Sequence, residues 1–121
     1  MPRLLKTERL KRSMEFKAVF QQCRKLEEAH LALYVQFSGD AALRKFGVSL
    51  SRALGKAYLR NRLKRRLREI YRVEKEKFRG GYQIILVPRR GSAGRTYDEL
   101  KTSFLTLAAR AGLLPRMKQG S

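Results

Sequence analysis

One segment of the sequence limits the fold more than any other, because it can only form a long helix with a single buried side. From Lys56 onward the large apolar residues recur at helical spacing, and Gly80 and Gly81 end the pattern. We therefore predict a helix over residues 56–79, which must pack against another element. Its apolar stripe consists of Leu59, Leu63, Leu67, Ile70, Tyr71 and Phe78.

Three segments with strand patterns surround this helix. Residues 30–37 alternate Leu31, Leu33, Val35 and Phe37 with His30, Ala32, Tyr34 and Gln36, as a strand with two different faces does. Residues 46–50 alternate in the same way, and the intervening GDAALRK predicts a hairpin with antiparallel strands. The run YQIILVP at 82–88 is continuously apolar, which is typical of a strand covered on both faces.

Two further helices are predicted toward the ends of the chain. Ser13 can cap a helix over residues 13–23, whose apolar positions are Phe16, Val19, Phe20 and Cys23. Thr96 and Glu99 have the spacing of a capping box, and Gly112 is a natural helix stop. The last helix presents Tyr97, Leu100, Phe104, Leu107, Ala108 and Ala111 on one face. The order of elements is thus α-β-β-α-β-α.

The length of 121 residues allows one domain. We assign residues 13–114 to it, preceded by a basic arm over 1–12 and followed by a disordered tail over 115–121. The arm can also be read as a frayed terminus.

The charge of the chain indicates a polyanionic partner. Lys and Arg number 29 and Asp and Glu number 10, which leaves a net charge of +19. Nucleic acid is the first candidate and acidic lipid the second. Seven of the cations lie in LRNRLKRRLREIYR with one acid, Glu69, whereas a solvated helix face would intersperse more acids. Arginine predominates in this run, and its planar fork favours RNA or DNA phosphates over a lipid surface.

Two residues allow two readings each. Asn61 lies among the cations and can contact a phosphate or a base, or simply be solvated. Tyr34 points away from the Leu31–Phe37 apolar face, so it can stack on unpaired bases or lie beneath the first helix. Phe16 and Phe20 are read as core residues from their helical spacing alone.

The sequence offers no sign of catalysis or metal binding by the protein. His30 is the only histidine and has no Asp or Cys nearby in sequence to activate it, and Asp40 and Asp98 lie far apart. Cys23 is the single cysteine, which excludes an internal disulfide and a multi-cysteine zinc site and fits a small apolar helix residue. A lone thiol is commonest in reducing compartments, so we expect a cytoplasmic protein. No membrane span or signal peptide is visible either.

The segment FGVSLSRALGKAYLRNRLKRRLREIYR resembles the signature of the protein subunit of bacterial ribonuclease P. The family pattern is a strand with Gly and Ser or Thr, followed by G-x-A-x-x-R-N-x-x-K-R-x-x-R. It is met here by Gly47, Ser49, Gly55, Ala57, Arg60, Asn61, Lys64, Arg65 and Arg68. The resemblance covers roughly residues 6–114. The chain departs from it at Ala53, where a second basic residue is frequent, and at Cys23 and Arg24, where a glycine often ends the first helix.

The resemblance implies a two-layer α/β (α+β) sandwich with the topology αβββαβα. It also implies a mixed sheet of about four strands and a left-handed crossover through the basic helix. A short extra strand near residues 25–29, which the residue patterns do not predict, is implied as well.

The resemblance further implies a function as part of a ribonucleoprotein enzyme. One protein would join a catalytic RNA, which removes the 5′ leader of precursor tRNA with Mg²⁺ bound mainly by the RNA, and the protein would have no catalytic residue. The expected contacts to the catalytic RNA are Arg52, Lys56, Arg60, Asn61, Arg62, Arg65 and Arg66. The expected lining of a leader cleft between the first helix and the sheet is Phe16, Phe20, Tyr34, Lys64 and Arg68. This favours the stacking reading of Tyr34.

Two other functions compete with this one. A ribosomal or RNA-packaging protein would share the positive charge but would not stimulate cleavage of precursor tRNA. A helix-turn-helix DNA-binding protein is disfavoured, because the chain has strands and lacks a pair of short helices.

Overall fold

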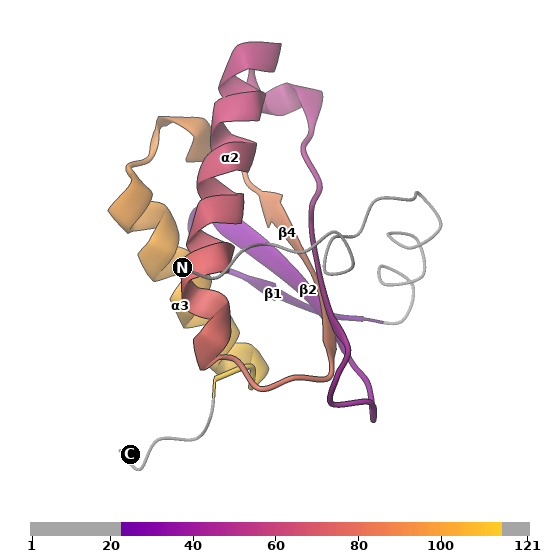
Figure 1. The fold of residues 1–121 in the computed structure, drawn as a ribbon. Helices are drawn as coiled ribbons and strands as arrows, with labels where there is room; N and C mark the ends of the chain where they lie inside the picture. The colour runs from indigo at the N-terminus through magenta and orange to yellow at the C-terminus, as the bar shows by residue number, and fades with distance from the viewer. Residues whose placement is uncertain (1–22, 115–121) are drawn as a thin grey trace.

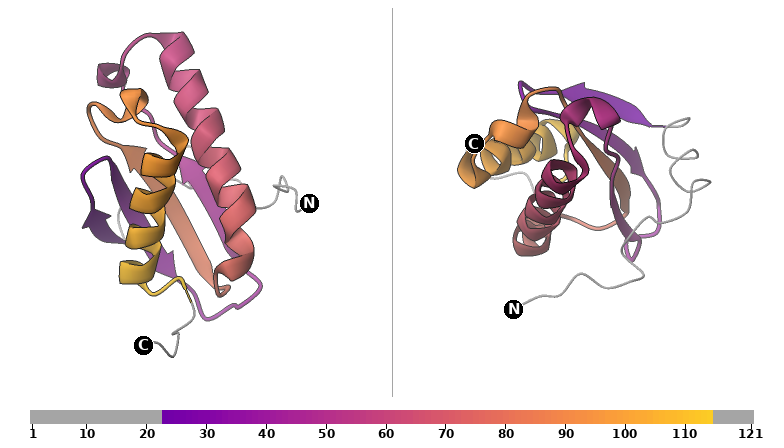
Figure 2. Two further views of the ribbon diagram at one scale, coloured as in Figure 1. Left: turned by 90° about the vertical axis from the view of Figure 1, so that its left-hand side faces the viewer. Right: turned by 90° about the horizontal axis from the view of Figure 1, so that it is seen from above.

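Two helices cover one face of a mixed four-stranded sheet (Figure 1, and Figure 2 from two further sides). The computed structural model describes residues 23–114. Its strands are β1 (Arg24–Glu27), β2 (Leu31–Phe37), β3 (Arg44–Val48) and β4 (Tyr82–Pro88). Its helices are α2 (Ala57–Glu74) and α3 (Tyr97–Ala111), with 3-10 turns at Arg52–Leu54, Lys75–Lys77 and Ser92–Gly94. The predicted arm over 1–12, the predicted tail over 115–121 and all but Cys23 of the predicted first helix lie outside the described residues.

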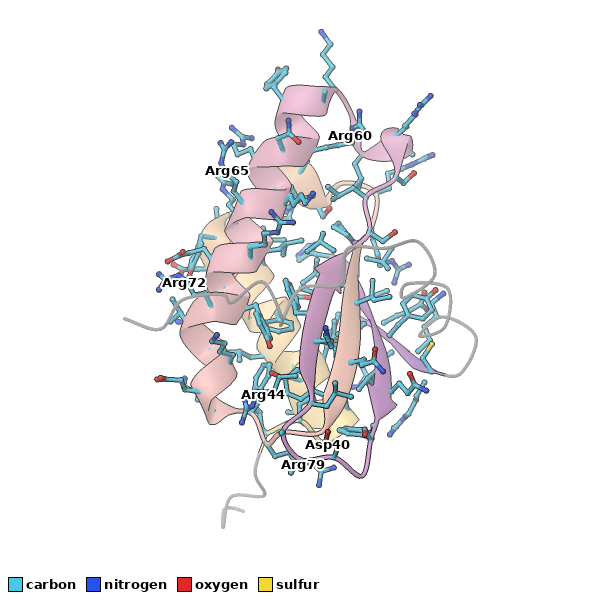
Figure 3. The ribbon with its side chains drawn as sticks, turned by 45° about the vertical axis from the view of Figure 1, so that its right-hand side comes forward. Asp40, Arg44, Arg60, Arg65, Arg72 and Arg79 are labelled. Atoms are coloured by element: carbon cyan, nitrogen blue, oxygen red, sulfur yellow. The ribbon has the colours of Figure 1, made fainter. Side chains whose placement is uncertain are left out.

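The strand order is β1-β2-β4-β3, with β3 parallel to β4 and the other neighbours antiparallel. With the helix layer behind the sheet in Figure 3, β4 lies to the right of β3, so the crossover through α2 is left-handed. The mixed sheet and its two-layer packing confirm the fold class. The extra strand implied by the resemblance is also present, as β1. Residue patterns could not predict β1, because only Leu26 of its four residues is buried.

The predicted hairpin between the second and third strands is wrong, because β4 lies between them. The chain from Ser38 to Leu43 instead crosses the start of β4. The Leu43 carbonyl accepts hydrogen bonds from the N–H groups of Gly81 (2.8 Å) and Tyr82 (3.1 Å). A Cβ on Gly80 would lie 2.0 Å from the Ala41 carbonyl oxygen, and Gly81 has a φ of +82°. The two glycines therefore permit this crossing in addition to ending the helical pattern.

The core lies between the helix layer and the sheet and is centred on aromatic contacts. The rings of Phe46 on β3 and Tyr71 on α2 stack with centroids 4.1 Å apart. The Tyr71 hydroxyl forms a buried hydrogen bond of 2.7 Å with the hydroxyl of Tyr82 on β4. β4 is buried on both faces, as its continuous apolar run predicts.

The basic helix is shorter than predicted. α2 ends at Glu74, and the 3-10 turn Lys75–Lys77 follows. Tightening the last turn brings Phe78 into the core from outside the helix, so the apolar stripe is longer than the helix itself. At the other end of the predicted stripe, Leu59 is only half-buried.

The capping box of α3 is confirmed. The Thr96 hydroxyl accepts a hydrogen bond from the Glu99 N–H (3.1 Å), and the Glu99 carboxylate accepts one from the Thr96 N–H (2.9 Å). The second bond lowers the pKa of Glu99, because it stabilises the charged carboxylate. At the other end, Gly112 adopts the left-handed conformation that ends the helix, with a φ of +84°.

Replacing Thr96 by Ala should lower the free energy of unfolding by about 1 kcal/mol, because the first turn of α3 loses its side-chain acceptor. Urea or thermal unfolding followed by circular dichroism measures this. Thr102→Ala, at an exposed position within α3, is the matched control and should change stability by less than about 0.5 kcal/mol. Equal losses in the two variants would contradict the role of the cap.

Candidate nucleic-acid interface

The surface of α2 that faces away from the core carries an almost unbroken set of cations. The helix buries Leu63, Leu67 and Ile70. Half a turn away, Asn61, Arg62 and Arg65 are exposed. In Figure 3 Arg65 projects from the outer side of α2, whereas Arg60 lies on the opposite side, between the helix and the turn that precedes it. We call Asn61, Arg62 and Arg65 the outer row.

Half-buried cations lie on the two flanks of α2. One hydrogen bond shows which flank faces α3, and the other flank faces the opposite way. Arg66 Nη1 donates to the Arg95 carbonyl oxygen (3.2 Å) just before α3, so this flank faces α3. Arg60, Lys64 and Arg68 lie on the opposite flank at i, i+4 and i+8, which turns them toward β3 at the edge of the sheet. Arg60 Nε is buried and has no hydrogen-bond partner among the described residues.

The carboxylates of the described residues neutralise other cations. On α2, Glu69 accepts a hydrogen bond from Arg72 Nε (3.0 Å), which lowers the pKa of Glu69. Further ion pairs between described residues are Lys25–Glu27, Lys77–Glu74, Lys101–Glu74, Arg95–Glu99 and Arg110–Glu28. Within residues 23–114 no carboxylate pairs with Arg60, Arg62 or Arg65. Arg60, Arg62 and Arg65 therefore give the first half of α2 a cationic surface that no described carboxylate compensates.

Two further predicted contacts lie where α2 begins. Arg52 is exposed in the turn Arg52–Leu54, and Lys56 is the exposed N-cap of α2. Lys56 gives the helix no side-chain hydrogen bond, and the first turn contains no acid. Helix starts normally carry acidic or capping side chains, which complement the helix dipole. An anion bound here would supply the missing negative charge.

The face of the sheet turned away from α2 and α3 carries Tyr34. The strand pairing places Tyr34 between Lys25 on β1 and Ile85 on β4, and Gly47 on β3 is the next residue in line. Lys25 Nζ lies 5.6 Å from the centre of the Tyr34 ring. The pKa of Lys25 is raised, first by its hydrogen bond with Glu27 and then by Tyr34. Tyr34 thus lies on the predicted face, beside a cation.

The residues expected to line the leader cleft come from different elements. The described part of the structure does not bring all of them together in one site. Phe16 and Phe20 lie outside the described residues. Lys64 and Arg68 lie on the β3 flank of α2, and β4 and β3 separate Tyr34 from the sheet edge by about 10 Å. A row of paired residues, Tyr34, Ile85 and Gly47, runs across the strands from the tyrosine to that edge. The last residue of the row is a glycine, which adds no bulky side chain there.

Sequence reasoning missed Tyr58, whose side chain is 66% exposed in the first turn of α2. Asn61, Arg62 and Arg65 follow Tyr58 by three, four and seven residues, so Tyr58 lies on the same side of the helix and extends the outer row. This spacing is visible in the sequence. The apolar stripe and the cations account for the segment without Tyr58, so the sequence alone does not single it out.

A pocket of about 350 Å³ lies where α3 begins beside the β1–β2 turn. It brings His30 together with acids that are distant in sequence, but the side chain of Glu99 already caps α3 and Glu28 pairs with Arg110. The residues that line this pocket are Glu28, Ala29, His30, Asp98, Glu99, Thr102 and Ser103.

No three His, Cys, Asp or Glu residues within 23–114 are placed to hold a metal ion. No helix in this part of the chain is long and apolar enough to cross a membrane.

A mixed sheet with an uncompensated, arginine-rich crossover helix defines the class: a small basic α/β protein suited to a polyanionic partner. Comparison with known proteins narrows this class. The family model described as Ribonuclease P matches residues 4–112, and the chain belongs to that family.

Relatives in two bacteria cover nearly the whole chain, and both are called ribonuclease P protein component. The protein of Symbiobacterium thermophilum is 35% identical over 111 residues, which are 92% of this chain and 96% of the relative. That of Clostridium kluyveri is 34% identical over 107 residues, which are 87% and 95%.

Solved structures share the architecture. The RNase P protein from Thermotoga maritima matches with a TM-score of 0.76 and 28% identity, over 85% of this chain and 96% of that one. The RNase P protein of Staphylococcus aureus matches with a TM-score of 0.81 and 24% identity, over 91% and 100%, which shows the same fold.

Replacing Arg62 by Ala should leave the free energy of unfolding within about 0.5 kcal/mol of its original value, because the exposed guanidinium has no ion-pair partner among the described residues. Leu63→Ala, at the adjacent and 2% exposed position, should cost about 2–5 kcal/mol. Urea unfolding measures both. A loss at Arg62 as large as that at Leu63 would assign Arg62 a structural role.

Proposed function

We propose that this chain is the protein subunit of a ribonuclease P holoenzyme. It binds the catalytic RNA and the 5′ leader of precursor tRNA, and it promotes the Mg²⁺-dependent hydrolysis that forms the mature 5′ end. The observation that carries the proposal is the uncompensated cationic surface on α2, in a chain that belongs to the Ribonuclease P family.

The first half of α2 contacts the catalytic RNA. Guanidinium groups pair with phosphates through two parallel hydrogen bonds. Phosphates of the RNA would thus supply the negative charge that no described carboxylate supplies to Arg60, Arg62 and Arg65. Asn61 lies between Arg60 and Arg62, where its amide can bond a phosphate or a base edge. Arg52 and Lys56 extend the contact beyond the start of the helix, and Arg66 extends it toward α3.

The leader lies across the sheet face that bears Tyr34. An aromatic ring beside Lys25 offers a base a stacking surface and its phosphate a positive charge. The line through Ile85 and Gly47 leads the strand toward the edge where Lys64 and Arg68 lie. The same scaffold thus separates two tasks: α2 binds folded RNA and the sheet binds a single strand.

The chemistry belongs to the RNA in this proposal. The described residues do not form a set of ligands that fits Mg²⁺, so no step is assigned to a protein-bound ion. Mg²⁺ held mainly by the RNA would supply the chemistry of the hydrolysis. The protein neutralises phosphates, and this lowers the repulsion between catalytic RNA and substrate. One protein per catalytic RNA, acting in the cytoplasm, completes the proposal.

Adding the full chain to a bacterial ribonuclease P RNA at low Mg²⁺ should increase the rate of precursor-tRNA cleavage, because protein cations replace part of the screening that Mg²⁺ otherwise provides. Gel analysis of the released leader measures the rate. The protein without RNA should release no leader. RNA binding without any stimulation of cleavage would instead indicate a ribosomal or RNA-packaging protein.

Replacing Tyr34 by Leu should weaken binding of leader-bearing precursor roughly five-fold or more and leave binding of mature tRNA nearly unchanged. Leu preserves apolar contact with Ile85 but removes the ring, and Tyr34→Phe is the control that keeps it. Holoenzyme affinities for the two RNAs measure the difference. Equal losses for both RNAs would return Tyr34 to a purely structural role.

A further inference from the structure

Tyr58 is exposed in a way that the fold does not explain. Its side chain is 66% exposed, while Phe37 and Val73, the other exposed large apolar residues within 23–114, are 41% and 38% exposed. The ring of Phe37 is covered by the Arg79 guanidinium, 4.9 Å from its centroid. Val73 has no ring. Tyr58 is therefore the described aromatic residue that presents most of its ring to solvent.

The surroundings of Tyr58 are cationic and polar. Asn61 and Arg62 follow at i+3 and i+4, so their side chains flank the ring, and Arg65 follows one turn later. Lys56 precedes it at the start of the helix. No acid lies in this turn. An exposed ring on such a surface can stack on a nucleobase while its neighbours bind the adjoining phosphates.

We propose that Tyr58 stacks on an unpaired base of the RNA bound by α2, with Arg62 and Arg65 holding the phosphates beside it. The inference rests on the proposed RNA-binding function and deepens it by naming the kind of RNA at this site. The site takes a bulged, looped or otherwise single-stranded nucleotide. Paired bases are already stacked on both sides, so a continuous duplex offers no face to the ring.

The charge of the surface argues for RNA over a protein partner. An apolar protein surface would leave Arg62 and Arg65 buried without partners, which is costly. Phosphates on both sides of a splayed base satisfy the guanidinium groups and leave the apolar ring for the base. About 6 Å of helix separates Tyr58 from Arg62, which allows one nucleotide to contact both.

Affinity measurements with a bacterial ribonuclease P RNA transcript distinguish stacking from charge. Tyr58→Ala should weaken binding by the full chain roughly five-fold or more, while Tyr58→Phe should stay within about two-fold, because the ring and not the hydroxyl carries the contact. The slope of log affinity against log salt should be unchanged in Tyr58→Ala. In Arg62→Ala it should become shallower by about 0.7 to 0.9, the loss of one phosphate contact.

Fluorescence supplies a direct readout, because the chain contains no tryptophan. Tyr58→Trp introduces a single reporter at the proposed site, and its emission should be quenched when the transcript binds. Val73→Trp is the matched control, exposed on the same helix about 22 Å further along, and its emission should change little.

The outcomes separate the two proposals. If the unmodified chain binds the transcript but Tyr58→Ala binds as tightly, or Tyr58→Trp is not quenched, the stacking inference fails and the proposed function stands. If a fully paired RNA quenches Tyr58→Trp as strongly as the transcript does, the assignment to an unpaired base is overturned. If the unmodified chain binds no transcript, both proposals fail.

Discussion

The contact between Phe46, Tyr71 and Tyr82 holds together the part of the fold on which everything else depends. The Phe46–Tyr71 stack attaches α2 to β3, and the Tyr71–Tyr82 hydrogen bond attaches α2 to β4. These are the three elements of the parallel crossover. Because the contact lies in the second half of α2, it leaves the first half free to expose its arginines.

The charges of α2 follow the same division. In the second half, Glu69 pairs with Arg72, and the buried Glu74 lies 2.8 Å from Lys77 and 3.6 Å from Lys101. In the first half, no described carboxylate pairs with Arg60, Arg62 or Arg65. Neighbouring like charges there repel one another by a few tenths of a kcal/mol per pair, and burial of Leu63 and Leu67 offsets this cost. Packing against the core thus offsets the repulsion among the cations of α2, while Arg60, Arg62 and Arg65 have no described carboxylate partner.

Local signals in the sequence predicted what depends on local interactions. The stripe of α2, the apolar run of β4 and the Thr96–Glu99 cap of α3 each follow from residues within one or two turns or one strand. Strand order could not be predicted in this way, because β4 pairs with β2 across more than 40 residues. β1 has too few buried residues to be recognised alone, and the resemblance supplied it. Among the proposed RNA contacts, the cations of α2 were predicted from their density, whereas Tyr58 was proposed only from the exposure of its ring.

The position of β4 has a consequence for how the chain is made. β4 is the inner strand that joins β2 to β3, yet it follows both of them and α2 in the sequence. During synthesis β2 and β3 therefore cannot be joined in one sheet until residue 88 has left the ribosome. Until then the apolar stripe of α2 also lacks the β3–β4 surface on which it packs. Folding of this small basic protein is thus postponed until β4, which ends about three quarters of the way along the chain, has emerged from the ribosome.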